Sequence, residues 1–385
     1  MVKAVRDGWS RRSVATEFGV SLSHVQRWVT RAGQDRLDRV DFSDRRDGPK
    51  AAGNRTAASV EDLVLELRRQ LKDESPLGEF GAVAIHRELQ RQRPRLRPVP
   101  TIRTIGRILQ RRGALDGRRR VRRCPPPPGW YLRRRNGDVD CVDIVEGLHL
   151  EGGGRVEILN VISLHGALPG SWPREKIHAK TVVNALLSHW KVFGLPAYAQ
   201  FDNDNVFQGP HHHQDVVGQV TRLCLSLGVT PVFTPPRETG FQASIENFNG
   251  RWQAKVWARF HFGTSRRALL SQSDKFLRAL RQRTAERIAS APPRRSIPEN
   301  WRLDIREITP GVIIYLRRTN DKGQAQLLGH TFDVDGNWVH RLVRAEVDLK
   351  RECIRFYALR RRVPNDQPLL RTIPHQMTRR TRFRE

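Results

Sequence analysis

Apolar residues recur at helical spacing in the first part of the chain. Val14–Phe18 supplies one apolar helical face, and Val25 and Trp28 supply another after Gly19. A glycine can adopt the positive φ that a tight turn between helices needs. Two helices that pack closely around such a turn are typical of a helix-turn-helix, and we predict one in residues 1–50. Its second helix is expected to present four side chains to the DNA major groove: Ser23, His24, Gln26 and Arg27.

A second helix-turn-helix is predicted over residues 51–116. Leu63, Leu67 and Leu71 define its first helix, and the segments 84–89 and 101–109 give two more, joined by a stretch rich in Pro and Arg. We expect Arg103 and Arg107 to face outward toward DNA. The buried stripe of the last helix is expected to comprise Ile102, Ile105, Ile108 and Leu109.

Strand and helix signals alternate in residues 136–300. Three successive strands are predicted first, and helices and strands then follow in turn. This order indicates a mixed sheet covered by helices, which is an α/β core. The preceding segment 117–135 is rich in Arg and Pro, so we predict an extended linker that follows a DNA backbone.

Short apolar strands separated by turns fill residues 301–385. The turns contain Asp321–Gly323 and Asp335–Asn337. Such strands predict a small closed β-barrel. The predicted fold class is therefore multidomain, with all-α helix-turn-helix units, an α/β core and a small C-terminal β-barrel.

The charge of the chain is large and unevenly distributed. The 385 residues carry a formal net charge of +29, of which residues 1–135 hold +17, residues 136–300 hold +4 and residues 301–385 hold +8. Cationic flanks attract polyanions, so double-stranded DNA is the expected partner. An arginine-rich genome is the alternative explanation, since 59 of the 69 basic residues are Arg, but such a bias would affect all segments alike.

Membrane and disulfide-rich classes are not expected. No stretch approaches the ~18 apolar residues of a membrane span, and the basic N-terminus is not followed by the apolar run of a secretory signal. The four cysteines are widely spaced and form no CxxC motif. We therefore expect a cytoplasmic protein associated with the nucleoid.

Three carboxylates in the α/β core lie in unusual settings. Asp143 lies within an apolar strand, Asp202 ends a short strand and Glu246 begins a helix. Charges in such places cost folding free energy unless they are paired or bind a cation. Divalent cations such as Mg²⁺ relieve the repulsion between neighbouring carboxylates. Each acid taken singly is also compatible with an ordinary surface position, and Asp138 and Asp140 compete with Asp143 as the first ligand.

Three segments of the core resemble a known family: VDIVEGLHLEGGGRVEILNVIS, PAYAQFDNDNVF and FTPPRETGFQASIENFNGRW. They are similar to the DDE transposases and integrases of the retroviral-integrase superfamily, in particular bacterial insertion-sequence transposases. The resemblance implies an RNase H-like catalytic core in which Asp143, Asp202 and Glu246 are catalytic and bind two Mg²⁺ (or Mn²⁺) ions. It also implies cleavage of phosphodiester bonds, transfer of a 3′-hydroxyl into target DNA, and a homo-oligomer that assembles on the terminal repeats of an element.

Further candidates remain near these motifs. Arg251 and Lys255 follow Glu246 and are expected to contact DNA phosphates. The run His211–His213 reads as a polar loop rather than as a metal site. Two alternative functions stay open, namely a non-catalytic DNA-binding relative that acts as a repressor or architectural factor, and an RNase H-like nuclease.

Overall fold

The computed structural model describes residues 1–43, 56–115, 138–164, 168–210, 213–238, 240–304, 306–361, 363 and 365–377. The chain divides into two compact units, Met1–Glu61 and Asp62–Glu385. The predicted linker, residues 117–135, lies outside the described residues. Among the described residues, no helix combines the length and the apolar character needed to cross a bilayer.

The first unit is a helix-turn-helix, as predicted. It contains α1 (Val2–Arg6), α2 (Arg11–Glu17), α3 (Leu22–Ala32) and a 3₁₀ turn η1 (Leu37–Arg39). Gly19 makes the turn between α2 and α3 with a φ of 63°, and the Ser21 side chain caps α3 by accepting a bond from the His24 N–H. Val25 is fully buried beneath α2, where Val14 and Ala15 meet it.

Three further helices follow: α4 (Ala58–Glu74), α5 (Ala82–Gln92) and α6 (Ile102–Arg111). Thr101 caps α6 by accepting a bond from the Thr104 N–H. Ile102 is 44% exposed, so its predicted burial is wrong, and the buried stripe begins one turn later. The shared core of these helices comprises Val64, Leu67, Ile85, Leu89, Ile105, Ile108 and Leu109.

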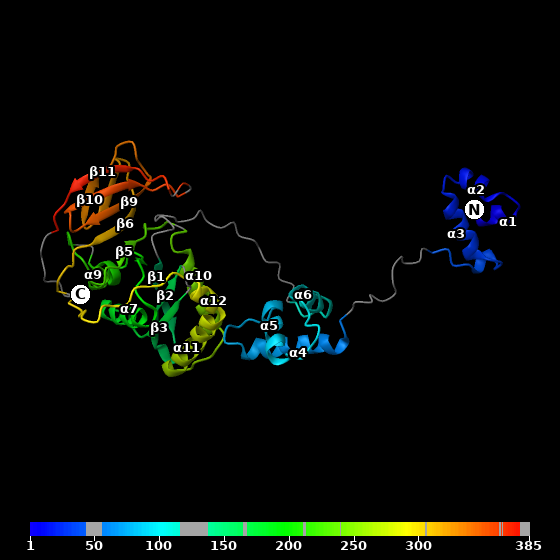
Figure 1. Ribbon diagram of the computed structural model, residues 1–385, viewed down its shortest axis with the longest axis horizontal. Coiled ribbons are helices and arrows are strands. Elements are labelled where there is room, and N and C mark those ends of the chain that lie inside the picture. Colours follow the sequence, from blue (N-terminus) through cyan, green and yellow to red (C-terminus); the bar gives the residue numbers. More distant parts are fainter. Residues whose placement is uncertain are drawn as a thin grey trace. The chain divides into compact units, whose positions relative to one another are not determined.

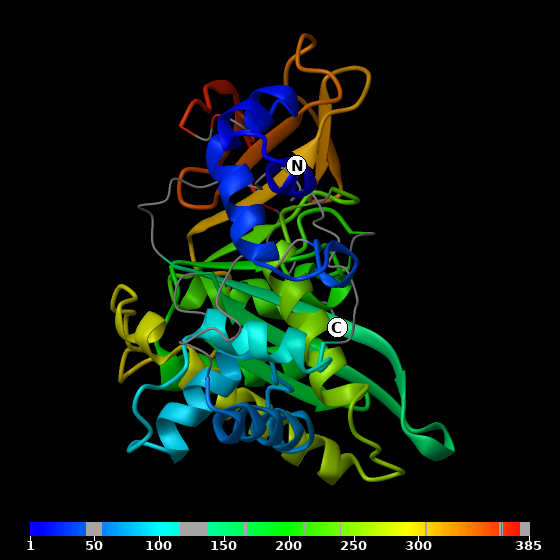
Figure 2. The same cartoon turned by 90° about the vertical axis from the view of Figure 1, so that its right-hand side faces the viewer.

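A nine-stranded mixed sheet runs through the second unit in the order β11-β10-β9-β6-β5-β4-β1-β2-β3 (Figure 1). Its strands are β1 (Val139–His149), β2 (Arg155–Ser163), β3 (Pro169–Arg174), β4 (Tyr198–Phe201), β5 (Thr230–Phe233), β6 (Val312–Arg318), β9 (Leu342–Asp348), β10 (Cys353–Ala358) and β11 (Leu369–Pro374). A separate hairpin contains β7 (Gln324–Leu327) and β8 (His330–Asp333). The long hairpin of β1 and β2 is visible at the lower right of Figure 2.

Helices cover both faces of the sheet around β1 (Figure 1). On one face, Val142 packs with residues of α7 (Ala179–Phe193) and α9 (Gln219–Ser226). On the other face, Cys141 and Val145 pack with α10 (Ala243–Trp252) and α11 (Arg266–Arg283). Successive side chains of a strand point to opposite faces, so this packing fixes which helix each residue of β1 faces. The remaining helices are α8 (Asn205–Gln208), the π-helical turn η3 (Gln253–Trp257) and α12 (Ala285–Ala289).

The predicted C-terminal β-barrel is not confirmed. Instead, β6 pairs in parallel with β5, with Val232 opposite Ile314 and Phe233 opposite Tyr315. Strands β9, β10 and β11 then extend the same sheet in antiparallel fashion. Phe233 and Tyr315 stack with ring centroids 5.1 Å apart, and the same hydrophobic core includes Phe356 on β10. An open edge at β5 allowed this continuation, which strand spacing alone does not reveal.

Candidate active site

Asp143 lies within β1 and Asp202 directly follows β4, at matching positions of two paired strands. β1 and β4 run in parallel, and Cys141 lies opposite Gln200. Each aspartate stands two residues beyond its member of this pair. Since side chains two residues apart lie on the same face of a strand, the register brings the two carboxylates close together on the face covered by α10.

Asn249 of α10 fixes the position of the Asp143 carboxylate. Its Nδ2 donates a 2.7 Å hydrogen bond to Asp143 Oδ2. Its Oδ1 accepts a 2.8 Å bond from Nδ2 of Asn160, which lies opposite Asp143 on β2. Asn160 and Asn249 were not identified from the sequence as part of the site. Asn160 could have been found, because it is a polar residue within the mostly apolar strand β2.

Glu246 lies in the first turn of α10, three residues before Asn249, and its side chain is exposed. Residues three apart on a helix are neighbours on its surface, so Glu246 is displayed on the side of α10 that bonds to Asp143. Its charge contributes to the raised pKa of Asp143. Asp143 and Asp202 thus lie at matching positions of two paired strands, and Glu246 lies on the helix that bonds to Asp143. A shared metal site of all three acids stays a prediction.

Burial and neighbouring negative charge disfavour the ionised forms of Asp143 and Asp202. Burial, followed by the charge of Asp202, raises the pKa of Asp143 to about 6, despite the hydrogen bond from Asn249. Burial also raises the pKa of Asp202, and the charges of Asp204 and Glu146 add to this effect. Neighbouring carboxylates with raised pKa values are suited to binding a cation, because its positive charge stabilises their ionised forms.

Asp138 and Asp140 do not belong to this cluster. They alternate with Asp143 along the chain and lie on the opposite face, where Trp190 Nε1 of α7 donates a 2.9 Å bond to Asp140 Oδ2. The Arg294 guanidinium binds both carboxylates, at 2.6 Å from Asp140 Oδ1. Asp140 is fully buried. These two acids thus share an ion pair with one arginine, and they do not face the Asn249 side chain that bonds to Asp143.

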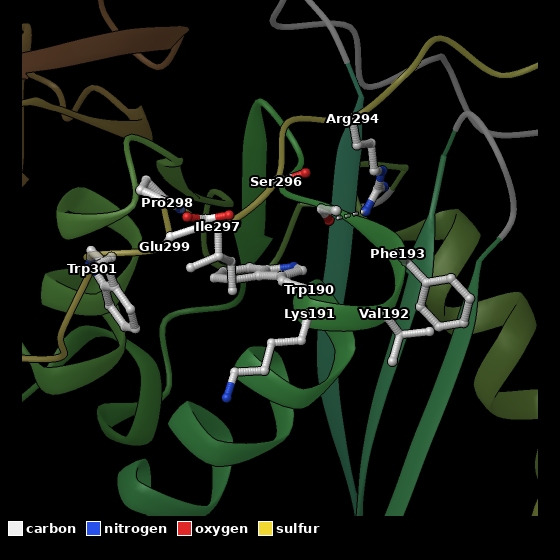
Figure 3. A pocket seen from close by; sticks show the side chains of 11 residues that line it. Trp190, Lys191, Val192, Phe193, Arg294, Ser296, Ile297, Pro298, Glu299 and Trp301 are labelled. Atoms are coloured by element: carbon white, nitrogen blue, oxygen red, sulfur yellow. Dashed lines mark hydrogen bonds between the residues drawn. The ribbon is translucent and has the colours of Figure 1, made fainter.

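A cavity of 610 Å³ lies beside this ion-pair cluster, between the end of α7 and the segment 294–301 (Figure 3). The Arg294 side chain, labelled in Figure 3, donates a 3.3 Å hydrogen bond from Nη1 to the Gly194 carbonyl. Since Arg294 is also bound to two carboxylates, its charge is already compensated. The cavity therefore does not offer a cationic group for an anionic ligand at Arg294.

The predicted DNA-contact residues of α3 are mostly accessible. Ser23, Gln26 and Arg27 are exposed. His24 is partly buried, and its Nε2 accepts a 3.0 Å bond from Trp28 Nε1. The His24 ring therefore also supports the buried tryptophan, and its predicted contact with the groove stays a prediction. On α6, Arg103 and Arg107 are exposed, as expected.

The two basic residues that follow Glu246 are in different settings. Lys255 Nζ donates a 3.1 Å hydrogen bond to the carbonyl of Gly78, which lies between α4 and α5. Lys255 thus contacts protein, whereas the sequence predicted a phosphate contact. Arg251 is partly buried, and burial lowers its pKa.

A short N-terminal segment matches a known family model. Residues 1–39 match the family model of the homeodomain-like domain, which agrees with the helix-turn-helix described above. No curated protein matches the sequence significantly. Known structures similar to this one include the catalytic core of BIV integrase, at 14% identity over 37% of this chain and 83% of that chain, with a TM-score of 0.28.

Two other solved structures are similar at the same level. The simian T-cell lymphotropic virus intasome, in complex with a PP2A regulatory subunit, matches at 12% identity over 69% of this chain and 84% of that chain, with a TM-score of 0.34. The HTLV-2 integrase catalytic core in complex with magnesium matches at 13% identity over 37% of this chain and 86% of that chain, with a TM-score of 0.27.

The raised pKa of Asp143 predicts a pH-dependent gain in stability for Asp143→Asn. Between pH 4 and about 6 the folded wild type keeps a proton that the unfolded chain has released, so its free energy of unfolding falls as pH rises through this window. An asparagine at position 143 does not titrate, so it removes this loss of stability with rising pH. Its side-chain oxygen can still accept the hydrogen bond from Asn249. In EDTA at pH 7 the variant is expected to be more stable by up to about 3 kcal/mol. Urea unfolding at pH 4.5 and pH 7, for both proteins, measures the difference; a gap that is equal at the two pH values would contradict the prediction.

Proposed function

We propose that this protein is a DNA transposase or integrase that cleaves phosphodiester bonds at the ends of a mobile element and joins the resulting 3′-hydroxyl to target DNA. The observation that supports the proposal is the register of β1 and β4, which sets Asp143 and Asp202 at matching positions on the face covered by α10, the helix that carries Glu246. The helix-turn-helix of the first unit supplies the DNA-binding part. A bacterial insertion sequence as the source, a homo-oligomer on DNA and association with the nucleoid belong to the same proposal.

The donor set fits Mg²⁺ or Mn²⁺. All three side chains offer oxygen ligands, which these cations prefer, and the two aspartates have pKa values raised by burial and by neighbouring negative charge. Asp143, Asp202 and Glu246 would hold two ions. When bound, such ions stabilise both the attacking and the leaving oxygen of an in-line displacement at phosphorus.

The chain itself contributes position and electrostatics to two successive displacements. In the first, a water oxygen forms a bond to phosphorus and gives up a proton, while the bond to the 3′-oxygen breaks and that oxygen takes up a proton to become the free 3′-hydroxyl. In the second, this hydroxyl loses its proton and forms a bond to the phosphorus of a target phosphodiester, whose own 3′-oxygen leaves and takes up a proton. The Asn160–Asn249 pair would hold the Asp143 carboxylate in one orientation throughout both reactions.

DNA recognition would come from α3. Ser23, Gln26 and Arg27 are exposed on this helix, and the second helix of a helix-turn-helix is the one that enters the major groove. His24 would act indirectly by supporting Trp28. Arg103 and Arg107 on α6, and Arg251 near the acids, are further candidates for phosphate contacts.

The proposal is tested with duplex DNA from both flanks of the gene. Purified protein and Mg²⁺ are expected to produce a free 3′-hydroxyl at an element end and joined product with a target plasmid, while EDTA abolishes both. Binding without cleavage in Mg²⁺ and in Mn²⁺ would instead favour a repressor or architectural protein. Cleavage without joining would favour an RNase H-like nuclease.

A further inference from the structure

A second cluster of metal-binding residues lies outside the three-acid site. Asp215, His330 and His375 place one potential ligand atom each within 4.8 Å of one another. The Nε2 atom of His330 lies 3.1 Å from Asp215 Oδ1, and the Nε2 atom of His375 lies 2.8 Å from the same oxygen. The two rings meet edge to face with their centroids 5.3 Å apart. Two imidazole nitrogens thus converge on one carboxylate oxygen.

These separations match the space that a small transition-metal ion needs. In a tetrahedral zinc site with bonds of about 2.1 Å, neighbouring ligand atoms lie about 3.4 Å apart. The distances from Asp215 Oδ1 to the two imidazole nitrogens are slightly shorter than about 3.4 Å. A small outward movement of the two rings would therefore make room for the ion. Imidazole nitrogen together with one carboxylate is a donor set that suits Zn²⁺ and is poorly matched to Mg²⁺.

The three residues come from segments far apart in the sequence. Asp215 precedes α9 and is buried, His330 begins β8, and His375 directly follows β11. Main-chain bonds hold two of these segments in place: the Asp215 N–H donates to Leu328 O at 3.0 Å, and the His375 N–H donates to Glu352 O at 2.8 Å. The cluster therefore sits on a backbone that is already fixed around it.

His330 also lines a cavity of 750 Å³. Three protein ligands leave one position of a tetrahedral zinc ion open, and water normally fills such a position. Since one ligand borders the cavity, water can reach the cluster from that side. Polar residues of the cavity wall include Asn203, Arg317 and Gln326.

We propose that Asp215, His330 and His375 form a Zn²⁺ site with water as the fourth ligand. The ion ties the segment before α9 to β8 and to the chain that follows β11. It stabilises the outer part of the second unit, because binding to the folded state alone adds directly to folding free energy. The inference does not depend on the proposed DNA chemistry.

The test uses the full-length protein, stripped with EDTA and dialysed against Zn²⁺ in excess Mg²⁺, which occupies oxygen-rich sites. Metal analysis is expected to give one zinc per chain. His330→Gln and His375→Gln should each weaken zinc binding by more than about 100-fold. Even the loss of a residue that only hydrogen-bonds to a ligating histidine lowers metal affinity about 10–100-fold. Zinc should raise the thermal unfolding midpoint of the wild type and leave that of either variant unchanged.

Two controls keep the outcome decisive. The variant in which His211, His212 and His213 are all alanine should keep its zinc, which excludes the histidine run as the binding site. His330→Cys should still bind Co²⁺ and should add a thiolate-to-cobalt charge-transfer band, because the new sulfur then ligates the ion. A wild type that binds no zinc after dialysis, or a His330→Gln variant that keeps it, would overturn the proposal and leave a hydrogen-bonded Asp–His–His group.

Discussion

Asp143→Asn, Asp202→Asn and Glu246→Gln are each expected to lower DNA cleavage and strand transfer by more than about 1,000-fold, equivalent to about 4 kcal/mol in the activation free energy. Each change removes one negative charge and nearly preserves the shape of the side chain. Since the same metal ions would serve both displacements, cleavage and joining should fall together. Quantitative gel assays with DNA that flanks the gene measure both products.

DNA binding separates loss of chemistry from loss of fold in these variants. The first unit does not contain the three acids, so a mobility-shift assay should give unchanged affinity for the DNA ends. Glu286→Gln, an exposed carboxylate on α12, is the matched control and should keep full activity. If any of the three acid variants retained activity within a few-fold of the wild type, the three-carboxylate assignment would be wrong.

Asp140→Asn is expected to destabilise the second unit by about 3–5 kcal/mol, because it leaves the buried Arg294 guanidinium with an incomplete set of partners. The Trp190 indole N–H also loses a charged acceptor. The free energy of unfolding in urea measures the effect. Because of this expected loss of stability, Asp140→Asn is not suitable as a control for activity.

Asp274→Asn provides the matched comparison for Asp140→Asn. Asp274 forms an exposed i,i+4 ion pair with Arg278 on α11 at 3.0 Å, and such surface pairs contribute at most about 1 kcal/mol. The cost of Asp140→Asn should therefore exceed that of Asp274→Asn several-fold. Equal costs would show that the Arg294 cluster contributes no more than a surface pair.

The alternation of β1 shows how much of the site could be predicted. The apolar residues Val142 and Ile144 flank Asp143, and the structure shows which face of the sheet each nearby acid occupies. Asp138 and Asp140 share a face with Val142, toward α7, whereas Asp143 shares the face of Cys141, toward α10. Side chains alternate between the two faces of a strand, and this alternation can be read from the positions of the residues alone. The sequence could therefore assign these acids to two opposite faces.

Contacts between distant segments could not be predicted in the same way. Arg294 is 154 residues from Asp140, and Lys255 is 177 residues from Gly78. Neither partner has a local pattern that reveals the other. The pairing of β5 with β6 is equally non-local, and for this reason strand spacing predicted a separate barrel where the described chain forms one continuous sheet.

The metal dependence of Asp143→Cys tests the central claim, that these carboxylates bind the ions used in catalysis, most directly. A thiolate is a poor ligand for Mg²⁺ and a better one for softer divalent ions such as Mn²⁺. The variant is expected to be inactive in Mg²⁺ and to regain DNA cleavage in Mn²⁺, whereas Asp204→Cys should show no such change of metal preference. Full activity of Asp143→Cys in Mg²⁺, or no activity in either metal while the protein remains folded and bound to DNA, would contradict a direct contact between Asp143 and the metal.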